Sequence, residues 1–158
     1  MGGLFEMNGF VKCWYFLYKL TRKLPPPLRP FCNIFYRFYC VLIGVDIPYQ
    51  VRIGSGLKIS HPSGIVINEN AILGENVWIR CNTVIGNDIL TNKAPIIGSN
   101  VSIGANACII GDVKVGNNSI IGAGAIIVKD IPPYSVVVGN PGRVIKTLSI
   151  NNLKDDIR

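Results

Sequence analysis

The sequence is poor in histidine and in acidic residues, and both shortages exclude kinds of site. Its 158 residues include a single histidine, His61, and nine acidic residues against sixteen lysines and arginines. The five cysteines form no CxxC pair, which excludes the zinc sites built from cysteine and histidine. We therefore expect no metal cofactor. The odd cysteine count without a secretory signal predicts reduced thiols and a cytoplasmic location.

Long apolar runs are missing as well. A membrane-spanning helix needs roughly 18 to 20 apolar residues, and the longest runs here are interrupted by lysine or arginine. Residues 1–45 hold six basic residues and one acidic residue among many aromatic ones. This mixture is more typical of a membrane surface or an anionic partner than of nucleic-acid recognition. We expect residues 9–45 to make peripheral contact with the inner membrane face, with packing against the rest of the protein as the alternative, and no nucleic-acid partner.

The chain divides into three parts by composition. Residues 1–45 form a basic, aromatic helical segment, in which an amphipathic helix over about 9–24 is stopped by three prolines and a second helix covers about 30–42. Residues 46–146 are the main domain, and residues 147–158 are a short polar tail.

The main domain is a six-residue repeat. Aliphatic residues recur at a spacing that neither an α-helix nor a simple strand produces. They are Ile47, Ile53, Ile59, Ile67, Leu73, Ile79, Ile85, Ile97, Ile103, Ile109, Val115, Ile121 and Ile127. A hexapeptide repeat has this spacing because a short strand and a turn consume six residues, and each coil stacks its aliphatic residue on the coil below. Glycine and asparagine beside these positions fit tight corners with positive φ. The sequence predicts a mainly β solenoid with a core of stacked Ile and Val.

Two interruptions break the spacing. Ile59 and Ile67 are eight residues apart, and His61 lies between them. Two extra residues bulge the turn and direct the histidine away from the core, as bulges do beside active sites. The other interruption, residues 87–95, is polar and ends in proline, and its Thr91 occupies a repeat position. We expect it to leave the solenoid as a loop at the rim of a site.

Two stretches of the repeat resemble a known family. They are VDIPYQVRIGSGLKISHPSGIVINEN and IGANACIIGDVKVGNNSIIGAGAIIVKDIPPYSVVVGNPGRVI. Both resemble the hexapeptide-repeat acyltransferases, in particular the serine acetyltransferase branch, over the span from Val45 to Lys146. The resemblance implies a left-handed parallel β-helix, acetyl-CoA as co-substrate, and a homotrimer with sites between subunits. The handedness rests on the resemblance alone, because spacing does not show it.

The resemblance makes His61 the base of an acetyl transfer. The attacking hydroxyl loses its proton as it reaches the thioester carbonyl, and an imidazole is suited to accept that proton. A carboxylate on the other ring nitrogen steadies such a base. Asp46, fifteen residues earlier and matching the family's VDI aspartate, is the first choice, and Glu69 is the second. Helix capping is the alternative role for Asp46. A backbone N–H near Gly86 is our choice for the oxyanion donor.

Residues for the co-substrate come from the later coils. Ala105 and Ala123 are small and leave room for a pantetheine arm along the backbone. Lys129 and Arg143 lie near the C-terminal end of the repeat and are candidates for contact with the nucleotide phosphates, with solvated surface charge as the alternative. The two cysteines within the coils are expected to be packing residues and not nucleophiles.

Two departures from the serine acetyltransferase pattern concern the acceptor. The family's aspartate before the histidine is Ser60 here, and the histidine of the family's loop is Ala94. Together with the short basic N-terminal segment, they favour an O-acetyltransferase for a saccharide hydroxyl in capsular or exopolysaccharide biosynthesis, similar to the colanic acid type. The alternatives are a serine O-acetyltransferase of cysteine biosynthesis and a non-catalytic scaffold solenoid.

Overall fold

Helical structure precedes the first strand. The computed structural model describes residues 17–20 and 22–148. The first expected helix, over 9–24, therefore lies partly outside the described residues. Its described part is helical at 17–20 and at 22–23.

The second expected helix is confirmed. A 3-10 turn, η1 (Pro26–Leu28), leads into α2 (Arg29–Ile43). Pro30 is tolerated in the first turn of α2, where its missing N–H would have no helical partner. Gly44 ends the helix at φ 72°, a left-handed conformation that glycine adopts without steric penalty.

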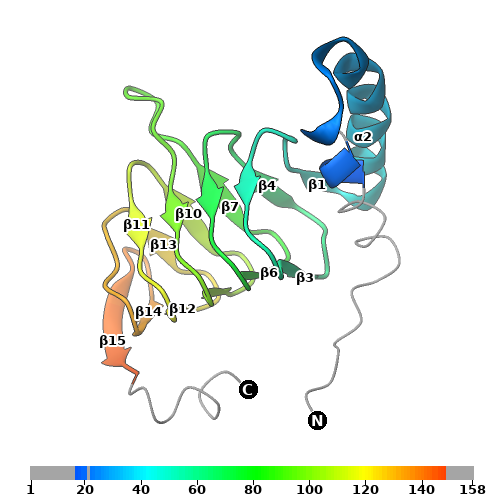
Figure 1. The fold of residues 1–158 in the computed structure, drawn as a ribbon. Helices are drawn as coiled ribbons and strands as arrows, with labels where there is room; N and C mark the ends of the chain where they lie inside the picture. Colours follow the sequence, from blue (N-terminus) through cyan, green and yellow to red (C-terminus); the bar gives the residue numbers. More distant parts are fainter. Residues whose placement is uncertain (1–16, 21, 149–158) are drawn as a thin grey trace.

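Three parallel sheets form the walls of a solenoid of about five coils (Figure 1). Each strand from β1 to β10 pairs with the strand three places later, so successive coils lie directly on one another. At the C-terminal end, β12 pairs with β14 instead. Sheet A has the order β1-β4-β7-β10-β13, sheet B has β11-β8-β5-β2, and sheet C has β15-β14-β12-β9-β6-β3. The bounds are β1 (Val45–Asp46), β2 (Arg52–Ile53), β3 (Lys58–Ser60), β4 (Ile65–Ile67), β5 (Ile72–Leu73), β6 (Trp78–Arg80), β7 (Val84–Gly86), β8 (Ile96–Ile97), β9 (Ser102–Ile103), β10 (Cys108–Ile110), β11 (Lys114–Val115), β12 (Ile120–Ile121), β13 (Ile126–Ile127), β14 (Ser135–Val138) and β15 (Arg143–Thr147). The expected left-handed parallel β-helix is confirmed.

The aliphatic residues of the repeat form the core. Twelve of the thirteen are buried, and Ile53 is half-buried. Each side chain lies on its equivalent in the next coil, as the register of Ile85 on Ile109 and of Ile109 on Ile127 shows. Burying an aliphatic side chain of this size contributes about 1.5 to 3 kcal/mol, so the stacked column is the main source of stability.

Asparagine side chains hold the corners together from outside. Asn76, Asn100 and Asn118 follow one edge at positive φ, and the amide of each of the first two donates to the carbonyl oxygen of the next at 3.1 Å. Asn82 and Asn106 make the same contact at another edge. Asparagine tolerates this left-handed conformation better than other residues with a side chain, which explains why the repeat places it there.

The two ends of the solenoid are closed differently. At the N-terminal end, α2 packs Tyr36 and Cys40 against the first coil, and the Tyr36 hydroxyl donates to the carbonyl of Ile47. At the other end, β15 adds to sheet C as an antiparallel strand beside β14. The sequence did not predict β15.

Among the described residues, no helix is long and apolar enough to cross a membrane, and no cluster of three or more His, Cys, Asp or Glu side chains forms a metal site.

Candidate functional site

His61 lies in a two-residue insertion at the edge where sheet C leads into sheet A. Ser60 pairs with Arg80, twenty positions later, whereas Val66 pairs with Val84, eighteen positions later. The extra residues are His61 and Pro62, because Ser63 is again in step with the coil above through the N–H of Asn82 at 2.9 Å. The insertion therefore adds the histidine without disturbing the stacked core.

The imidazole is directed away from the core. His61 is exposed and has φ 55°, so its backbone is left-handed at a residue that is not glycine. Such a conformation costs about 1 to 2 kcal/mol relative to a regular one. Gly64, at φ 73°, then returns the chain to the regular corner beside Asn82. Within the described part of the chain the His61 ring makes no hydrogen bond or ion pair, which leaves both nitrogens open to a substrate or a positioning group.

The carboxylate chosen to hold that ring has another partner. Asp46 lies in β1 and accepts a hydrogen bond from Nη1 of Arg37 in α2 at 2.8 Å, with both side chains about half exposed. Glu69 is exposed in the turn between β4 and β5. Contact of His61 with either carboxylate is therefore a proposal. A contact with Asp46 requires this carboxylate to share or leave Arg37.

A polar cluster borders the insertion on the outer face of sheet C. The indole N–H of Trp78 donates to the hydroxyl of Ser60 at 2.8 Å. The guanidinium of Arg80 stacks over the Trp78 ring, 4.2 Å from its centre, and donates to the hydroxyl of Ser102 at 3.3 Å. Sequence reasoning missed this cluster. The available signal was that Ser60, Trp78 and Arg80 all flank core positions and so point outward in paired strands.

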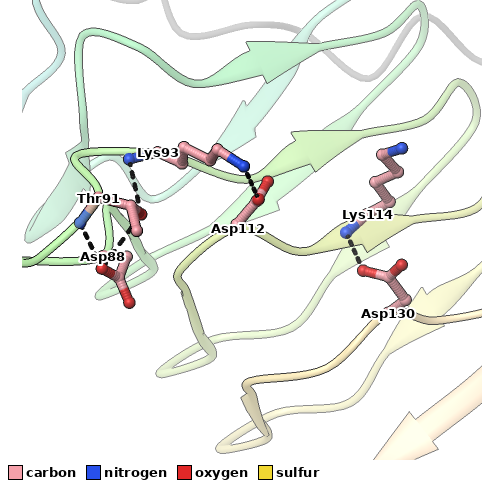
Figure 2. Close-up of polar contacts among 6 residues, drawn as sticks. All are labelled: Asp88, Thr91, Lys93, Asp112, Lys114 and Asp130. Atoms are coloured by element: carbon pink, nitrogen blue, oxygen red, sulfur yellow. Dashed lines mark hydrogen bonds and ion pairs between the residues drawn. The ribbon is translucent and has the colours of Figure 1, made fainter.

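The loop over residues 87–95 leaves the solenoid between β7 and β8, as expected. Its turn is held by the carboxylate of Asp88, which accepts hydrogen bonds from the Thr91 N–H at 2.8 Å and the Thr91 hydroxyl at 3.1 Å (Figure 2). The same carboxylate oxygen accepts a hydrogen bond from the N–H of Leu90 at 2.8 Å. The two backbone hydrogen bonds and the Thr91 hydroxyl lower the pKa of Asp88. At the tip, Ile89 and Leu90 are more than 90% exposed.

The base of the loop is tied to the next coil. Nζ of Lys93 contacts the carboxylate of Asp112 at 2.6 Å, and this contact raises the pKa of Lys93 (Figure 2). Ala94 and Pro95 are buried where the chain re-enters the solenoid. One coil further, the N–H of Lys114 donates to Asp130 at 2.8 Å. The loop is therefore a fixed turn on the solenoid edge.

The residues proposed for the co-substrate fall at two edges. Ala105 and Ala123 occupy equivalent corners after β9 and β12, on the same edge as His61, and Arg143 begins β15 near that edge beside the end of β14. Space is open there, because a Cβ built on Gly124 would meet nothing within 4 Å. Lys129 follows β13 and lies at the opposite edge of sheet A.

Gly86 lies with Lys129 at that second edge. It ends β7 directly before the loop, and its carbonyl accepts the N–H of Gly111 at 3.0 Å. A single chain therefore presents His61 at one edge of sheet A and Gly86 and the loop at the other.

Comparisons with known proteins agree on one family. Residues 94–129 match the model of the bacterial transferase hexapeptide (six repeats). A serine acetyltransferase from Mycobacterium tuberculosis is 42% identical over 110 residues, which cover 68% of this chain and 48% of that protein. The structure of a soybean serine acetyltransferase complexed with serine matches with a TM-score of 0.75 and 32% identity, over 86% of this chain and 56% of that one. A serine acetyltransferase from Brucella abortus in complex with coenzyme A matches with a TM-score of 0.78 and 28% identity, over 88% and 55%.

These matches correct the expected acceptor. The prediction of a saccharide acceptor and of a place in polysaccharide biosynthesis is wrong, because plant and bacterial relatives at 34 to 42% identity are serine acetyltransferases. The departures at Ser60 and Ala94 were given too much weight against similarity along the whole repeat. The chain spans only about a quarter to a half of the length of the curated relatives it matches. In its repeat, its fold and these matches, the chain is similar to the hexapeptide-repeat β-helix acyltransferases.

Proposed function

We propose that this chain is an acetyl-CoA-dependent serine O-acetyltransferase in which His61 is the general base. The observation that carries the proposal is an exposed histidine, inserted outside the stacked core, in a fold that matches serine acetyltransferases solved with serine and with coenzyme A over more than four fifths of the chain. The insertion gives the histidine no part in the core. A functional role explains its presence better than packing does.

The proposed reaction is a direct acyl transfer. The imidazole of His61 accepts the proton of the serine hydroxyl while that oxygen forms a bond to the acetyl carbon. The carbon–sulfur bond of the thioester then breaks, and the coenzyme A sulfur takes the proton. General-base assistance of this kind contributes about 10²- to 10⁴-fold. Asp46 is the proposed positioning residue, because a carboxylate on the second ring nitrogen fixes the tautomer and stabilises the imidazolium.

The proposed path of coenzyme A follows the edge that holds His61. Ala105 and Ala123 leave the corner backbone accessible, and Arg143 supplies a fixed cation for phosphate at the end of that edge. Gly86 as oxyanion donor and Lys129 as a phosphate contact lie across sheet A. Gly86 and Lys129 reach the coenzyme A bound at the His61 edge only if they come from a neighbouring copy. That copy must place its own Gly86 and Lys129 edge against the His61 edge of this chain.

This geometry supports the proposed homotrimer. Sites formed between copies join the His61 edge of one chain to the loop edge of the next, and three copies close such a head-to-tail arrangement into a ring. Light scattering gives the mass directly. Mixed trimers of a His61→Ala chain and a Lys129→Glu chain would regain activity at those sites that combine two intact edges. A monomeric active enzyme would contradict the shared site.

The acceptor is tested by coenzyme A release with L-serine against a panel of free sugars and saccharides. We expect turnover with serine and none above background with sugars. Because Ser60 replaces the family's aspartate, the KM for serine is expected to be high, and Ser60→Asp should lower it by about tenfold, since a hydrogen bond to a charged group contributes about 1.5 to 3 kcal/mol. Turnover with a saccharide and none with serine would refute the proposed function.

A further inference from the structure

The helix α2 has two apolar faces, and only one of them is used in the fold. Tyr36 and Cys40 face the first coil and are buried. The opposite face carries six large apolar side chains, each between 64 and 75% exposed, which we name the outer stripe. They are Phe31, Ile34, Phe35, Phe38, Val41 and Leu42.

The outer stripe has the spacing of a binding face. Its members recur at intervals of three and four residues, so they form one continuous strip along the helix. Soluble proteins rarely expose so many large apolar side chains together, and such patches mark surfaces that bind a partner or a membrane. A helix that is apolar on both faces is covered on both. Its location at the N-terminal end of the solenoid separates it from the loop and from β15 (Figure 1).

The charge of the segment that carries the outer stripe indicates its occupant. Residues 17–45 contain Lys19, Arg22, Lys23, Arg29 and Arg37 and no aspartate or glutamate. Asp46 of β1 pairs with Arg37, so the five cations and this one carboxylate give a net charge of +4. A second copy placed face to face on the stripe would bring this net charge of +4 against an equal one. An anionic bilayer surface offers the opposite charge together with an apolar layer for the aromatic side chains.

We propose that the outer stripe of α2 docks this protein on an anionic lipid bilayer. The 15 residues of α2 are about 22 Å long, shorter than the roughly 30 Å hydrocarbon core, so the helix lies in the plane of the interface and does not cross it. The phenylalanines enter the boundary between headgroups and acyl chains, and the cations contact lipid phosphates. This proposal is independent of the acceptor and of the catalytic role of His61.

Vesicle flotation of the full chain tests the proposal. We expect the protein to float with vesicles of mixed phosphatidylcholine and phosphatidylglycerol and to stay in solution with pure phosphatidylcholine. The triple variant Phe31→Ser, Phe35→Ser and Phe38→Ser should lose at least about tenfold in partitioning, whereas the same three changes to leucine keep it. Lys23→Gln should weaken it about fivefold at low salt, from about 1 kcal/mol per cation.

Two controls make the result decisive. Val144→Ser with Ile145→Ser removes exposed apolar side chains from β15, at the other end of the solenoid, and should leave flotation unchanged. Circular dichroism and thermal unfolding confirm that each variant folds. The proposal is overturned if wild-type protein ignores anionic vesicles. It is also overturned if the serine variant changes the mass in solution while flotation is unaltered, since the stripe is then an interface between copies.

Discussion

Gly104 and Gly86 provide a matched test of how tightly the coils stack beside the proposed coenzyme A path. Gly104 follows β9, and a Cβ at this position would overlap the backbone N of Ala123 and approach the carbonyl carbon of Gly122 to 2.7 Å. A Cβ on Gly86 would meet Cγ1 of Ile110 at 3.7 Å and Cγ1 of Val84 at 4.0 Å, which are ordinary contacts. Substitution by alanine should therefore have opposite effects at the two positions.

The expected magnitudes follow from this difference. Overpacking against fixed backbone costs about 1 to 3 kcal/mol, and restricting the unfolded chain returns about 0.4 to 1 kcal/mol. Gly104→Ala should lower the unfolding free energy by about 1 to 2 kcal/mol, which is about 2 to 8 °C in Tm for a domain of this size. Gly86→Ala should leave it unchanged or raise it by about 0.5 kcal/mol. The displaced Ala123 should also weaken coenzyme A binding in Gly104→Ala.

Thermal unfolding at fixed protein concentration and calorimetric titration with coenzyme A measure both effects. A Gly104→Ala protein as stable as wild type, with unchanged coenzyme A affinity, would refute the close stacking at this edge. Equal destabilisation of both variants would show that replacing any glycine in the coils lowers stability. The close approach of Ala123 to residue 104 would then not be the cause.

Three further predictions concern single side chains. Tyr36→Phe should cost about 1 to 3 kcal/mol in a denaturant titration, because the buried carbonyl of Ile47 loses its partner; an unchanged midpoint would contradict that contact. Because the folded pKa of Asp88 is lowered, its stabilisation of the loop is present above the ordinary aspartate pKa and is lost as pH falls below about 4. Amide exchange at Leu90 should show this loss in wild type and no such dependence in Asp88→Asn. Burial raises the pKa of Cys108, so its alkylation at neutral pH, followed by mass spectrometry, should be slower than that of free cysteine.

The sequence predicted the features that repeat. Ile85, Ile109 and Ile127 recur because each coil must bury one side chain at the same place, and burial leaves a periodic trace that can be read without coordinates. The insertion at His61 was visible for the same reason, as a departure from that period. The placement of asparagine at corners follows from its tolerance of positive φ.

Contacts between coils were not predictable in the same way. The hydrogen bond of Trp78 to Ser60 and the pairing of Asp46 with Arg37 depend on side-chain conformation and on register between segments far apart in the sequence. Lys129 was grouped with Arg143 because both are near the end of the repeat, yet the turn after β13 takes Lys129 to another edge. Linear proximity does not specify which edge of a three-sided coil a residue occupies.

The central claim is that His61 serves chemistry and not the scaffold, and His61→Gly tests it most directly. Glycine accepts φ 55° without strain, so the variant should unfold at the same temperature as wild type or slightly higher. Its rate of coenzyme A release from acetyl-CoA with L-serine should fall by about 10²- to 10⁴-fold. A folded glycine variant that acetylates serine at the wild-type rate would contradict the account.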